Sequence, residues 1–245
     1  MSDSLVIIPT YNESENILLM IDAVFGLEKE FDLLIIDDNS PDGTSDLVRQ
    51  MQQTYPTRLK LIERPGKKGL GTAYILGFEY GLEHGYEYIF EMDCDFSHNP
   101  QDLIRLYNAC KKGGFDMSVG SRYVTGGKVE NWPRDRIFLS YGASLYVRIL
   151  TWMPIKDPTA GFVCYKREVL QAINFDKIKF IGYAFQIEMK FAAQSLGFKI
   201  KEVPITFKDR VRGSSKITKG IMREGFFGVF KMVTNKIFDT YQRQN

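Results

Sequence analysis

Short apolar runs alternate with segments of helical length along the first half of the chain. Two of the runs, residues 5–8 (LVII) and 33–36 (LLII), are uninterrupted, which is typical of strands covered on both faces of a sheet. Strands that alternate with helices form βαβ units with right-handed crossovers, and these units build a mainly parallel sheet. We therefore predict an α/β fold. The predicted strands are residues 5–8, 33–36, 59–62, 86–90 and 116–119, and the predicted helices are residues 14–25, 44–53, 72–84 and 100–112.

Polar and acidic residues follow three of the predicted strands. They are residues 9–13 (PTYNE), residues 37–44 (DDNSPDGT) and residues 93–97 (DCDFS). The carboxyl ends of parallel strands meet at one edge of a sheet, where open α/β folds bind their ligands. Solvated turns use the same residue types, but acidic residues repeated at strand ends favour a binding cleft.

Asp93 and Asp95 are the most informative pair in these segments. We expect the strand before them to stay extended, so that residues i and i+2 point to one side and both carboxylates face one spot. Two anions held that close need a positive charge between them. Hard oxygen ligands of this kind predict Mg²⁺ or Mn²⁺ that also binds substrate phosphates. The alternative is a solvated loop, because Asp-x-Asp is a common sequence.

The composition argues against several other classes of site. The formal net charge is only +2, from 32 basic and 30 acidic residues, which argues against a nucleic-acid partner. The two histidines are too few for a histidine-rich metal site, and we expect His98 to cap the helix that begins near residue 100. Three widely spaced cysteines predict a reduced compartment without structural zinc. With no signal-peptide pattern and no apolar run of about 20 residues, we expect a cytoplasmic protein.

Several motifs together resemble those of the inverting GT-A glycosyltransferases of the family 2 type. The three acidic segments carry this general resemblance, and further motifs resemble the dolichyl- or polyprenyl-phosphate mannosyltransferases more narrowly. These motifs are residues 68–73 (KGLGTA), 92–100 (MDCDFSHNP), 120–123 (GSRY), 157–162 (DPTAGF) and 210–216 (RVRGSSK). The resemblance spans about residues 4–216 and keeps the family order.

The resemblance implies a GT-A domain over residues 1–216, with a mainly parallel, Rossmann-like sheet. The residue pattern beyond it predicts a C-terminal amphipathic helix within residues 217–245. It also implies transfer of mannose from GDP-mannose to a dolichyl-type polyprenyl phosphate. The products would be β-linked polyprenyl-phosphate mannose, formed with inversion, and GDP. The alternatives are a UDP-sugar donor (glucose or a HexNAc) on the same lipid, transfer to a soluble glycan, and a non-catalytic regulator that binds nucleotide sugars.

The resemblance assigns roles to individual residues at the sugar-donor end of the site. Asp93, Asp95 and Ser97 would hold the divalent cation, Mg²⁺ or Mn²⁺. Asp37 would mainly shape its loop. Cys94 stands where alanine is commoner in the family, and we expect only a packing change because its side chain faces away from the metal. The residues implied in binding the donor nucleotide are Pro9, Tyr11, Glu13, Ile36, Asp38, Asp93, Cys94, Arg210 and Lys216.

Basic residues mark the acceptor end of the implied site. By resemblance, Arg122, Arg136 and Ser140 bind the acceptor phosphate, which suits the bidentate geometry of guanidinium groups. The implied catalytic residues are Asp95 and Arg122. A lipid phosphate is already anionic near pH 7, since its second pKa is about 6, so a strong general base is unnecessary. Asp95 is the remaining candidate for such a base.

Two apolar segments raise the question of membrane contact. A final helix is expected over residues 218–241, where basic residues interleave with phenylalanines, a pattern that suits a helix at a membrane surface. The alternative is packing on the GT-A domain, on a membrane-anchoring partner or on a second copy in a homo-oligomer. Residues 137–153 are too short and too polar to span a bilayer, but they could line a groove for the acyl chain. We thus expect a peripheral protein at the cytoplasmic face of the membrane.

Overall fold

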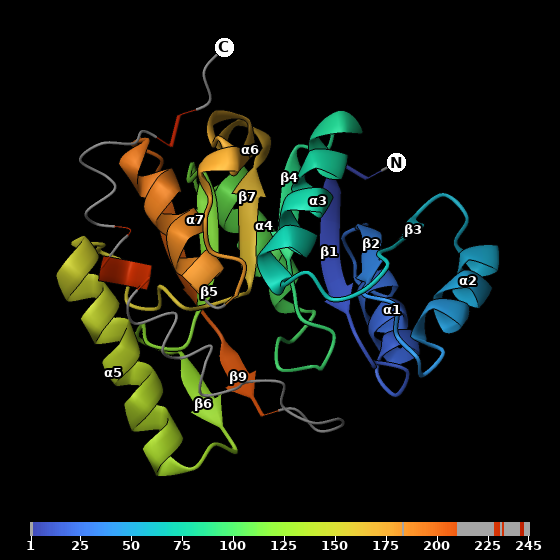
Figure 1. Ribbon diagram of the computed structural model, residues 1–245, viewed down its shortest axis with the longest axis horizontal. Coiled ribbons are helices and arrows are strands. Elements are labelled where there is room, and N and C mark those ends of the chain that lie inside the picture. The colour runs from blue at the N-terminus through green and yellow to red at the C-terminus, as the bar shows by residue number, and fades with distance from the viewer. Residues whose placement is uncertain (1, 183, 210–227, 231, 233–240, 243–245) are drawn as a thin grey trace.

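A seven-stranded sheet forms the centre of the molecule in the computed structural model, which describes residues 2–182, 184–209, 228–230, 232 and 241–242 (Figure 1). The strand order is β3-β2-β1-β4-β7-β5-β8, and every neighbouring pair is parallel except the two that involve β7. The prediction of a mainly parallel α/β fold is confirmed. The strands are β1 (Ser4–Thr10), β2 (Asp32–Asp37), β3 (Leu59–Glu63), β4 (Tyr88–Glu91), β5 (Met117–Ser121), β7 (Val163–Lys166) and β8 (Ile200–Pro204).

Helices cover both faces of this sheet. Along β1, Leu5 and Ile7 point into one layer while Val6 and Ile8 point into the other, as the two-residue period of a strand requires. The uninterrupted apolar runs therefore mark strands buried on both faces, as predicted. One layer holds α3 (Leu70–Glu83), α6 (Arg167–Ala172), the short 3₁₀ helix Phe175–Lys177 and α7 (Ala184–Ser195), and the other holds α1 (Ile17–Phe25), α2 (Thr44–Thr54) and α4 (Asp102–Lys111).

Glycine allows α3 to lie directly against the sheet. A Cβ atom on Gly77 would lie 2.7 Å from the side chain of Ile7, and one on Gly81 would lie 2.6 Å from Ile89. Both distances are shorter than van der Waals contact, so a larger residue at either position would push the helix away. The close packing holds α3 against β1 and β4, whose carboxyl ends carry two of the polar segments.

β7 runs antiparallel to its neighbours β4 and β5, and this direction determines which loops lie together at one edge of the sheet. β4 and β5 lie on either side of β7 and point the same way, so their carboxyl ends and the start of β7 share one edge of the sheet. The carboxyl ends of β1 and β2 lie at the same edge. There the backbone N–H of Gly120 donates to the carbonyl oxygen of Phe162 at 2.8 Å. We call this edge the rim: it carries the loops after β1, β2, β4 and β5 and the loop before β7.

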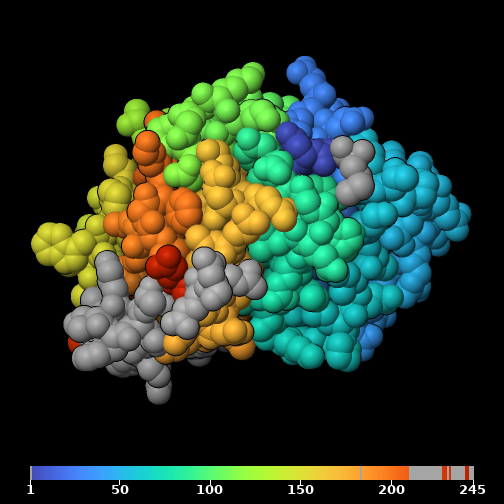
Figure 2. Space-filling view, turned by 90° about the horizontal axis from the view of Figure 1, so that it is seen from above, coloured from blue at the N-terminus to red at the C-terminus, as the bar shows by residue number. Residues whose placement is uncertain are grey.

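The chain leaves the rim between β5 and β7 and forms a smaller unit beside the sheet. β6 (Lys128–Glu130) pairs in parallel with β9 (Thr206–Lys208), and α5 (Arg134–Thr151) follows β6. α5 lies at the opposite end of the molecule from α2, as Figures 1 and 2 show. The sequence predicted neither small strand and indicated α5 only as an apolar segment.

The predicted C-terminal helix falls mostly outside the described residues, and so does the predicted domain boundary between residues 216 and 217. Among the residues described there, Val229, Met232 and Tyr241 are buried in the core that contains α7, while Phe230 is exposed. For those three buried residues the packing alternative holds. Of the helices that the structure describes, none combines the length and the apolar character that crossing a bilayer requires.

Candidate active site

The loops after β1 and β2 are joined by the carboxylate of Asp37. It accepts hydrogen bonds from the Thr10 hydroxyl at 2.8 Å and from the backbone N–H and hydroxyl of Ser40 at 2.8 and 2.6 Å. Asp37 therefore shapes these loops, as predicted. Each loop also contains an asparagine in the left-handed region, Asn12 (φ 55°) and Asn39 (φ 58°), a conformation that asparagine tolerates better than most residues.

Asp38, predicted to contact the sugar donor, is held by Arg64. The guanidinium donates from Nε to Oδ1 at 2.5 Å and from Nη2 to Oδ2 at 2.8 Å, and its Nη1 donates to the Thr72 hydroxyl at 2.7 Å. This bidentate pair fixes the orientation of the Asp38 carboxylate at the rim and offsets its charge. Arg64 could not be recognised from the sequence, because a single arginine after a strand forms no motif.

The other residues predicted to bind the nucleotide differ in their exposure. Tyr11 is half-buried, and the ammonium group of Lys67 lies 3.5 Å from the centre of its ring. Glu13 is buried near the start of α1. Pro9 is half-buried in β1 and pairs with Ile36 in β2. Ile36 has no exposed surface, so its side chain supports the loop from within the core rather than from the surface of the rim.

Asp93 and Asp95 lie in the rim loop after β4, but not in the extended segment that the sequence predicted. β4 ends at Glu91, and the residues that follow form bends in which Phe96 adopts the left-handed region (φ 60°). The expectation that strand alternation turns both carboxylates to one spot is therefore wrong, because the strand ends too early. A bulky residue with a positive φ is rare and occurs mostly in strained functional loops.

This loop presents oxygen atoms that suit a divalent cation. Asp95 is buried and its Oδ1 accepts from the backbone N–H of Ser97 at 3.0 Å, while the Asp93 side chain is 40% exposed. In the part of the chain that the structure describes, the buried Ser97 hydroxyl oxygen has no hydrogen-bond partner, which is costly unless a ligand supplies one. Within the described ranges no group of three or more His, Cys, Asp or Glu forms a metal cluster. The two carboxylates and the hydroxyl fit a hard cation that shares its other positions with phosphate and water.

His98 is buried behind this loop, so the prediction that it caps α4 is wrong. Its ring stacks on Phe162 with 4.8 Å between the ring centres, and its Nδ1 accepts from the backbone N–H of Asp93 at 3.3 Å. Burial lowers the pKa of His98 to about 4, so the ring is neutral near pH 7 and can accept this hydrogen bond. α4 begins later, at Asp102, and none of the described side chains caps its first residue by a hydrogen bond.

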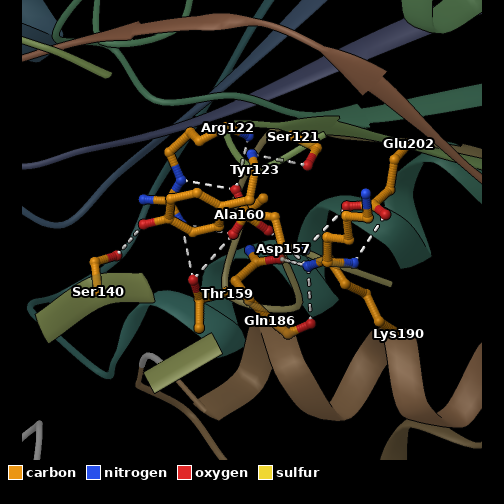
Figure 3. Close-up of polar contacts among 11 residues, drawn as sticks. Ser121, Arg122, Tyr123, Ser140, Asp157, Thr159, Ala160, Gln186, Lys190 and Glu202 are labelled. Carbon is orange, nitrogen blue, oxygen red and sulfur yellow. Dashed lines mark hydrogen bonds and ion pairs between the residues drawn. The ribbon is translucent and has the colours of Figure 1, made fainter. Parts of the chain in front are cut away.

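Arg122, predicted at the acceptor end, is held by Asp157 from the loop before β7 (Figure 3). Nε and Nη2 of Arg122 each donate to a different carboxylate oxygen at 2.7 Å, and its backbone N–H donates at 2.9 Å. Nη2 also donates to the Thr159 hydroxyl at 2.8 Å. Burial alone would favour protonated Asp157, but the charge and hydrogen bonds of Arg122 hold its pKa below the ordinary 3.8. The DPTAGF motif therefore positions Arg122, a role that the sequence did not reveal.

Aromatic side chains connect Arg122 with the other two predicted acceptor residues. The ring centre of Trp132 is 5.8 Å from Cζ of Arg122 and 4.0 Å from Cζ of Arg136. The Tyr123 hydroxyl donates to the Ser140 hydroxyl at 2.8 Å (Figure 3). The structure thus brings the three predicted residues together around Tyr123 and Trp132, two aromatic residues that the sequence analysis did not single out.

The late basic motif, residues 210–216, lies outside the described residues. Asp209, the residue before the motif, forms an ion pair with Arg136 at 3.1 Å. Arg210 and Lys216 lie outside the described residues, so their assignment to the donor nucleotide stays a prediction.

A buried charge network lies behind the rim and was not predicted. Lys190 of α7 has no exposed surface and donates to the carbonyl oxygen of Ala160 at 2.6 Å and to two oxygens of Gln186 at 2.9 and 3.3 Å (Figure 3). Gln186 in turn donates to Glu91, at the end of β4, at 2.5 Å. Burial raises the pKa of Glu91 to about 7 and lowers the pKa of Lys190 to about 8. The network ties β4 and α7 to the loop that carries Asp157.

Comparison with known proteins shows which protein family the chain belongs to. Residues 5–173 match the family described as Glycosyl transferase family 2, and the chain belongs to that family of glycosyltransferases. Polyprenol monophosphomannose synthase of Mycolicibacterium smegmatis is 45% identical over 226 residues, which cover 92% of this chain and 85% of that protein. Undecaprenyl-phosphate mannosyltransferase of Micrococcus luteus is 44% identical over 225 residues, which cover 92% of this chain and 91% of that protein.

Solved structures share the fold at much lower identity. Glucosyl-3-phosphoglycerate synthase from Mycobacterium tuberculosis, in complex with Mn²⁺, UDP and glucosyl-3-phosphoglycerate, has a TM-score of 0.66 at 15% identity and covers 95% of this chain and 79% of that chain. A mannosyltransferase from Pyrobaculum calidifontis, in complex with GDP-Man and Mn²⁺, has a TM-score of 0.57 at 16% identity, with coverage of 96% and 74%. These similarities confirm the GT-A fold and, at such identities, nothing further.

Proposed function

We propose that this chain transfers mannose from GDP-mannose to a polyprenyl phosphate and releases GDP and β-linked polyprenyl-phosphate mannose. The observation that carries the proposal is the 45% and 44% identity, over 92% of the chain, to a polyprenol monophosphomannose synthase and an undecaprenyl-phosphate mannosyltransferase. The family match over residues 5–173 also contains all five loops of the rim. A phosphate oxygen of the lipid forms the new bond to the anomeric carbon, and the bond from that carbon to the GDP oxygen breaks.

In this proposal Asp93, Asp95 and Ser97 hold a divalent cation, Mg²⁺ or Mn²⁺, against the diphosphate of the sugar donor. Support comes from the buried Ser97 hydroxyl, which has no hydrogen-bond partner among the described residues, and from the hard oxygen ligands beside it. Proteins of the same fold solved with Mn²⁺ give further support. When bound, such a cation supplies Lewis-acid stabilisation of the leaving diphosphate.

The loops after β1 and β2 bind the nucleoside of the sugar donor. Tyr11 and Glu13 lie on the first loop and Asp38 on the second, and Arg64 keeps the Asp38 carboxylate in one orientation for hydrogen-bond donors of the ligand. Cys94 is buried in the core layer that contains α4, which supports a contribution to packing. Side chains of both loops are already hydrogen-bonded in the absence of ligand. Binding of the nucleoside therefore costs little additional conformational entropy in these loops.

Arg122, Arg136 and Ser140 bind the acceptor phosphate. Asp157 fixes the plane of the Arg122 guanidinium. The Arg122 side chain therefore loses little further conformational freedom when the acceptor phosphate binds. A phosphate monoester is already anionic near pH 7 and attacks without a general base. The basic side chains orient the attacking oxygen and offset the negative charge that gathers between the two phosphate groups.

We further propose that the chain works as a peripheral protein at the cytoplasmic face of a membrane. The proposed acceptor is a lipid, and Cys94, Cys110 and Cys164 are all buried and form no disulfide, which suits a reducing compartment. Association with a second copy or with an anchoring partner stays a prediction.

Calorimetric titration with GDP and with UDP, each with and without Mn²⁺, is the first test. We expect GDP to bind in a cation-dependent way and radiolabelled mannose to pass from GDP-mannose to undecaprenyl phosphate. Tighter binding of UDP would keep the mechanism and replace the sugar donor. GDP binding without turnover on any lipid phosphate would favour a regulator, and binding of neither nucleotide would refute the proposal.

A further inference from the structure

The loop that carries Asp157, residues 156–161 (KDPTAG), lies between α5 and β7 and forms neither a helix nor a strand. Within this loop, which lies wholly in the described part of the chain, the backbone forms one hydrogen bond, from the N–H of Ala160 to the carbonyl oxygen of Asp157 at 3.3 Å. Backbone groups that pair so little among themselves need partners elsewhere to hold one conformation. The position of the Asp157 carboxylate therefore depends on side chains outside the loop.

Glu202 of β8 holds the start of this loop (Figure 3). Its Oε2 accepts from the backbone N–H of Lys156 at 2.8 Å, and its Oε1 accepts from the backbone N–H of Asp157 at 2.9 Å. Both carboxylate oxygens are thus used, and hydrogen bonds to a charged acceptor are stronger than those between neutral groups. Glu202 also pairs in register with Val119 of β5, the strand that leads to Arg122. The start of the loop is thereby fixed to the same part of the sheet as Arg122.

Lys190 of α7 holds the end of the loop from inside the core. Its ammonium group donates to the carbonyl oxygen of Ala160 and to two oxygens of Gln186, and these bonds use all three of its protons. Burial lowers the pKa of Lys190 to about 8, but the charges of Glu91 and Asp157 oppose the fall, so the ammonium group stays largely charged near pH 7. A buried charge is costly, and an apolar side chain could fill this place in the core at lower cost. What the ammonium group provides instead is a bond from α7 to the loop, three residues after Asp157.

Between these two attachments lie the groups that hold Arg122. Asp157 Oδ1 and the Thr159 hydroxyl both accept from its Nη2, at 2.7 and 2.8 Å (Figure 3). We propose that Lys190 and Glu202 are positioning residues: they hold both ends of the loop, so that Asp157 keeps the Arg122 guanidinium oriented for the acceptor phosphate. The acceptor part of this inference rests on the proposed function, whereas the orientation of Arg122 does not. Neither positioning residue contacts the substrate in this proposal.

Lys190→Met and Glu202→Gln each weaken one attachment and keep the approximate size of the side chain. The amide that replaces the Glu202 carboxylate has a single acceptor oxygen, so it cannot hold both backbone N–H groups in the same way. Each variant should raise the KM for a water-soluble, short-chain isoprenyl phosphate by about tenfold, while the affinity for GDP with Mn²⁺ stays within about twofold. Lys112→Met is the matched control for Lys190→Met, because Lys112 is exposed at the end of α4, and this variant should keep the wild-type KM.

The split between KM and kcat separates positioning from a merely structural role. Partial unfolding reduces the amount of active protein, which lowers the apparent kcat and leaves KM unchanged. If Lys190 acts through Asp157, adding Lys190→Met to Asp157→Asn should raise KM by less than about a further twofold, because the attachment then has no carboxylate to position. A further tenfold rise on that background, or an unchanged KM in the single variants, would overturn the inference. If Lys190→Met does not fold, Glu202→Gln on the same two backgrounds decides.

Hydrogen exchange at the Arg122 side chain tests the positioning without any turnover. In the wild-type protein its Nε–H donates to Asp157 at 2.7 Å and the side chain is 9% exposed, so this proton, followed by ¹⁵N NMR, should exchange slowly. Lys190→Met and Glu202→Gln should each speed the exchange by about tenfold or more, and wild-type rates in both would refute the positioning. If the wild-type protein transferred mannose to no isoprenyl phosphate, the proposed function would be refuted instead, and the exchange rates would still decide how Arg122 is held.

Discussion

Asp157→Asn removes the charged partner of Arg122 and preserves its size. In the wild-type protein Arg122 donates three hydrogen bonds to this carboxylate, at 2.7, 2.7 and 2.9 Å, and its side chain is only 9% exposed. An amide has one acceptor oxygen, and its NH₂ group faces a guanidinium that cannot accept. The substitution therefore leaves a buried positive charge without its counter-charge.

Removing one partner of a buried ion pair costs about 3–5 kcal/mol in the free energy of unfolding. For a chain of 245 residues this corresponds to a fall in Tm of roughly 6–20 °C. Asp22→Asn, on the exposed side of α1, is the matched control and should change the free energy of unfolding by less than about 0.5 kcal/mol. Urea unfolding of both variants measures the two values.

The stability difference should also depend on pH, in one direction. The pKa of Asp157 in the folded protein lies below 3.8, so its contribution is fully present above the pKa of the unfolded chain and is lost as the pH falls through the folded-state pKa. The gap in unfolding free energy between the wild-type protein and Asp157→Asn should stay constant near neutral pH and narrow below pH 3.8.

The same variant should distinguish the two ends of the site. Because Asp157 acts through Arg122, the KM for polyprenyl phosphate should rise by about tenfold or more while the affinity for GDP stays within about twofold. An unfolding free energy within about 1 kcal/mol of wild type would refute the energetic importance of the buried pair. An unchanged KM for the acceptor would refute the positioning role.

Five further substitutions test the metal site and the packing of glycines in α3 and α5. Asp93→Ala and Asp95→Ala should each lower transfer by at least about 100-fold and keep the circular dichroism of the wild-type protein, whereas near-normal turnover of both with Mn²⁺ present would defeat the metal assignment. Ser97→Ala removes a buried hydroxyl for which the described residues offer no hydrogen-bond partner, so stability without the cation should stay equal or rise while calorimetric Mn²⁺ affinity falls. An unchanged affinity would place the cation elsewhere. Gly77→Ala should destabilise by about 1–3 kcal/mol, because its Cβ would lie 2.7 Å from Ile7. Gly142→Ala, with nothing within 4 Å of the new atom, should stabilise α5 by about 0.5–1 kcal/mol, and equal Tm shifts for the two glycine variants would contradict this reasoning.

Local patterns in the sequence account for most of the parallel part of the fold. The apolar runs at residues 5–8 and 33–36 became β1 and β2, because strands covered on both faces need apolar residues at every position. β7 could not be found in this way. Its place between β4 and β5 depends on antiparallel pairing with residues far away in the chain, and a four-residue strand carries too short a pattern to reveal it.

The site residues that follow directly from the ends of parallel strands could be predicted. The residues that form ion pairs with them from distant parts of the chain could not. The acidic segments could be placed at one edge because parallel neighbours end together. Arg64 and Asp157 could not be assigned, since they lie 26 and 35 residues from Asp38 and Arg122 and only the fold brings them together. Lys190 looks in the sequence like the polar position of an amphipathic helix, yet the fold buries it completely.

Between Gly120 and Phe162 the chain makes an excursion that starts and finishes at a single 2.8 Å hydrogen bond between these two residues. The excursion carries Trp132, Arg136 and Ser140, whereas the nucleotide loops lie on β1, β2 and β4. Because its two ends meet on neighbouring strands, its exposed parts can change in length without moving those loops, while Val147, Met153 and Ile155 hold it in the core. If the excursion binds the acceptor as proposed, we expect that another excursion grafted between β5 and β7, with these three buried residues kept, would direct the sugar to a different acceptor while its nucleotide carrier stayed the same.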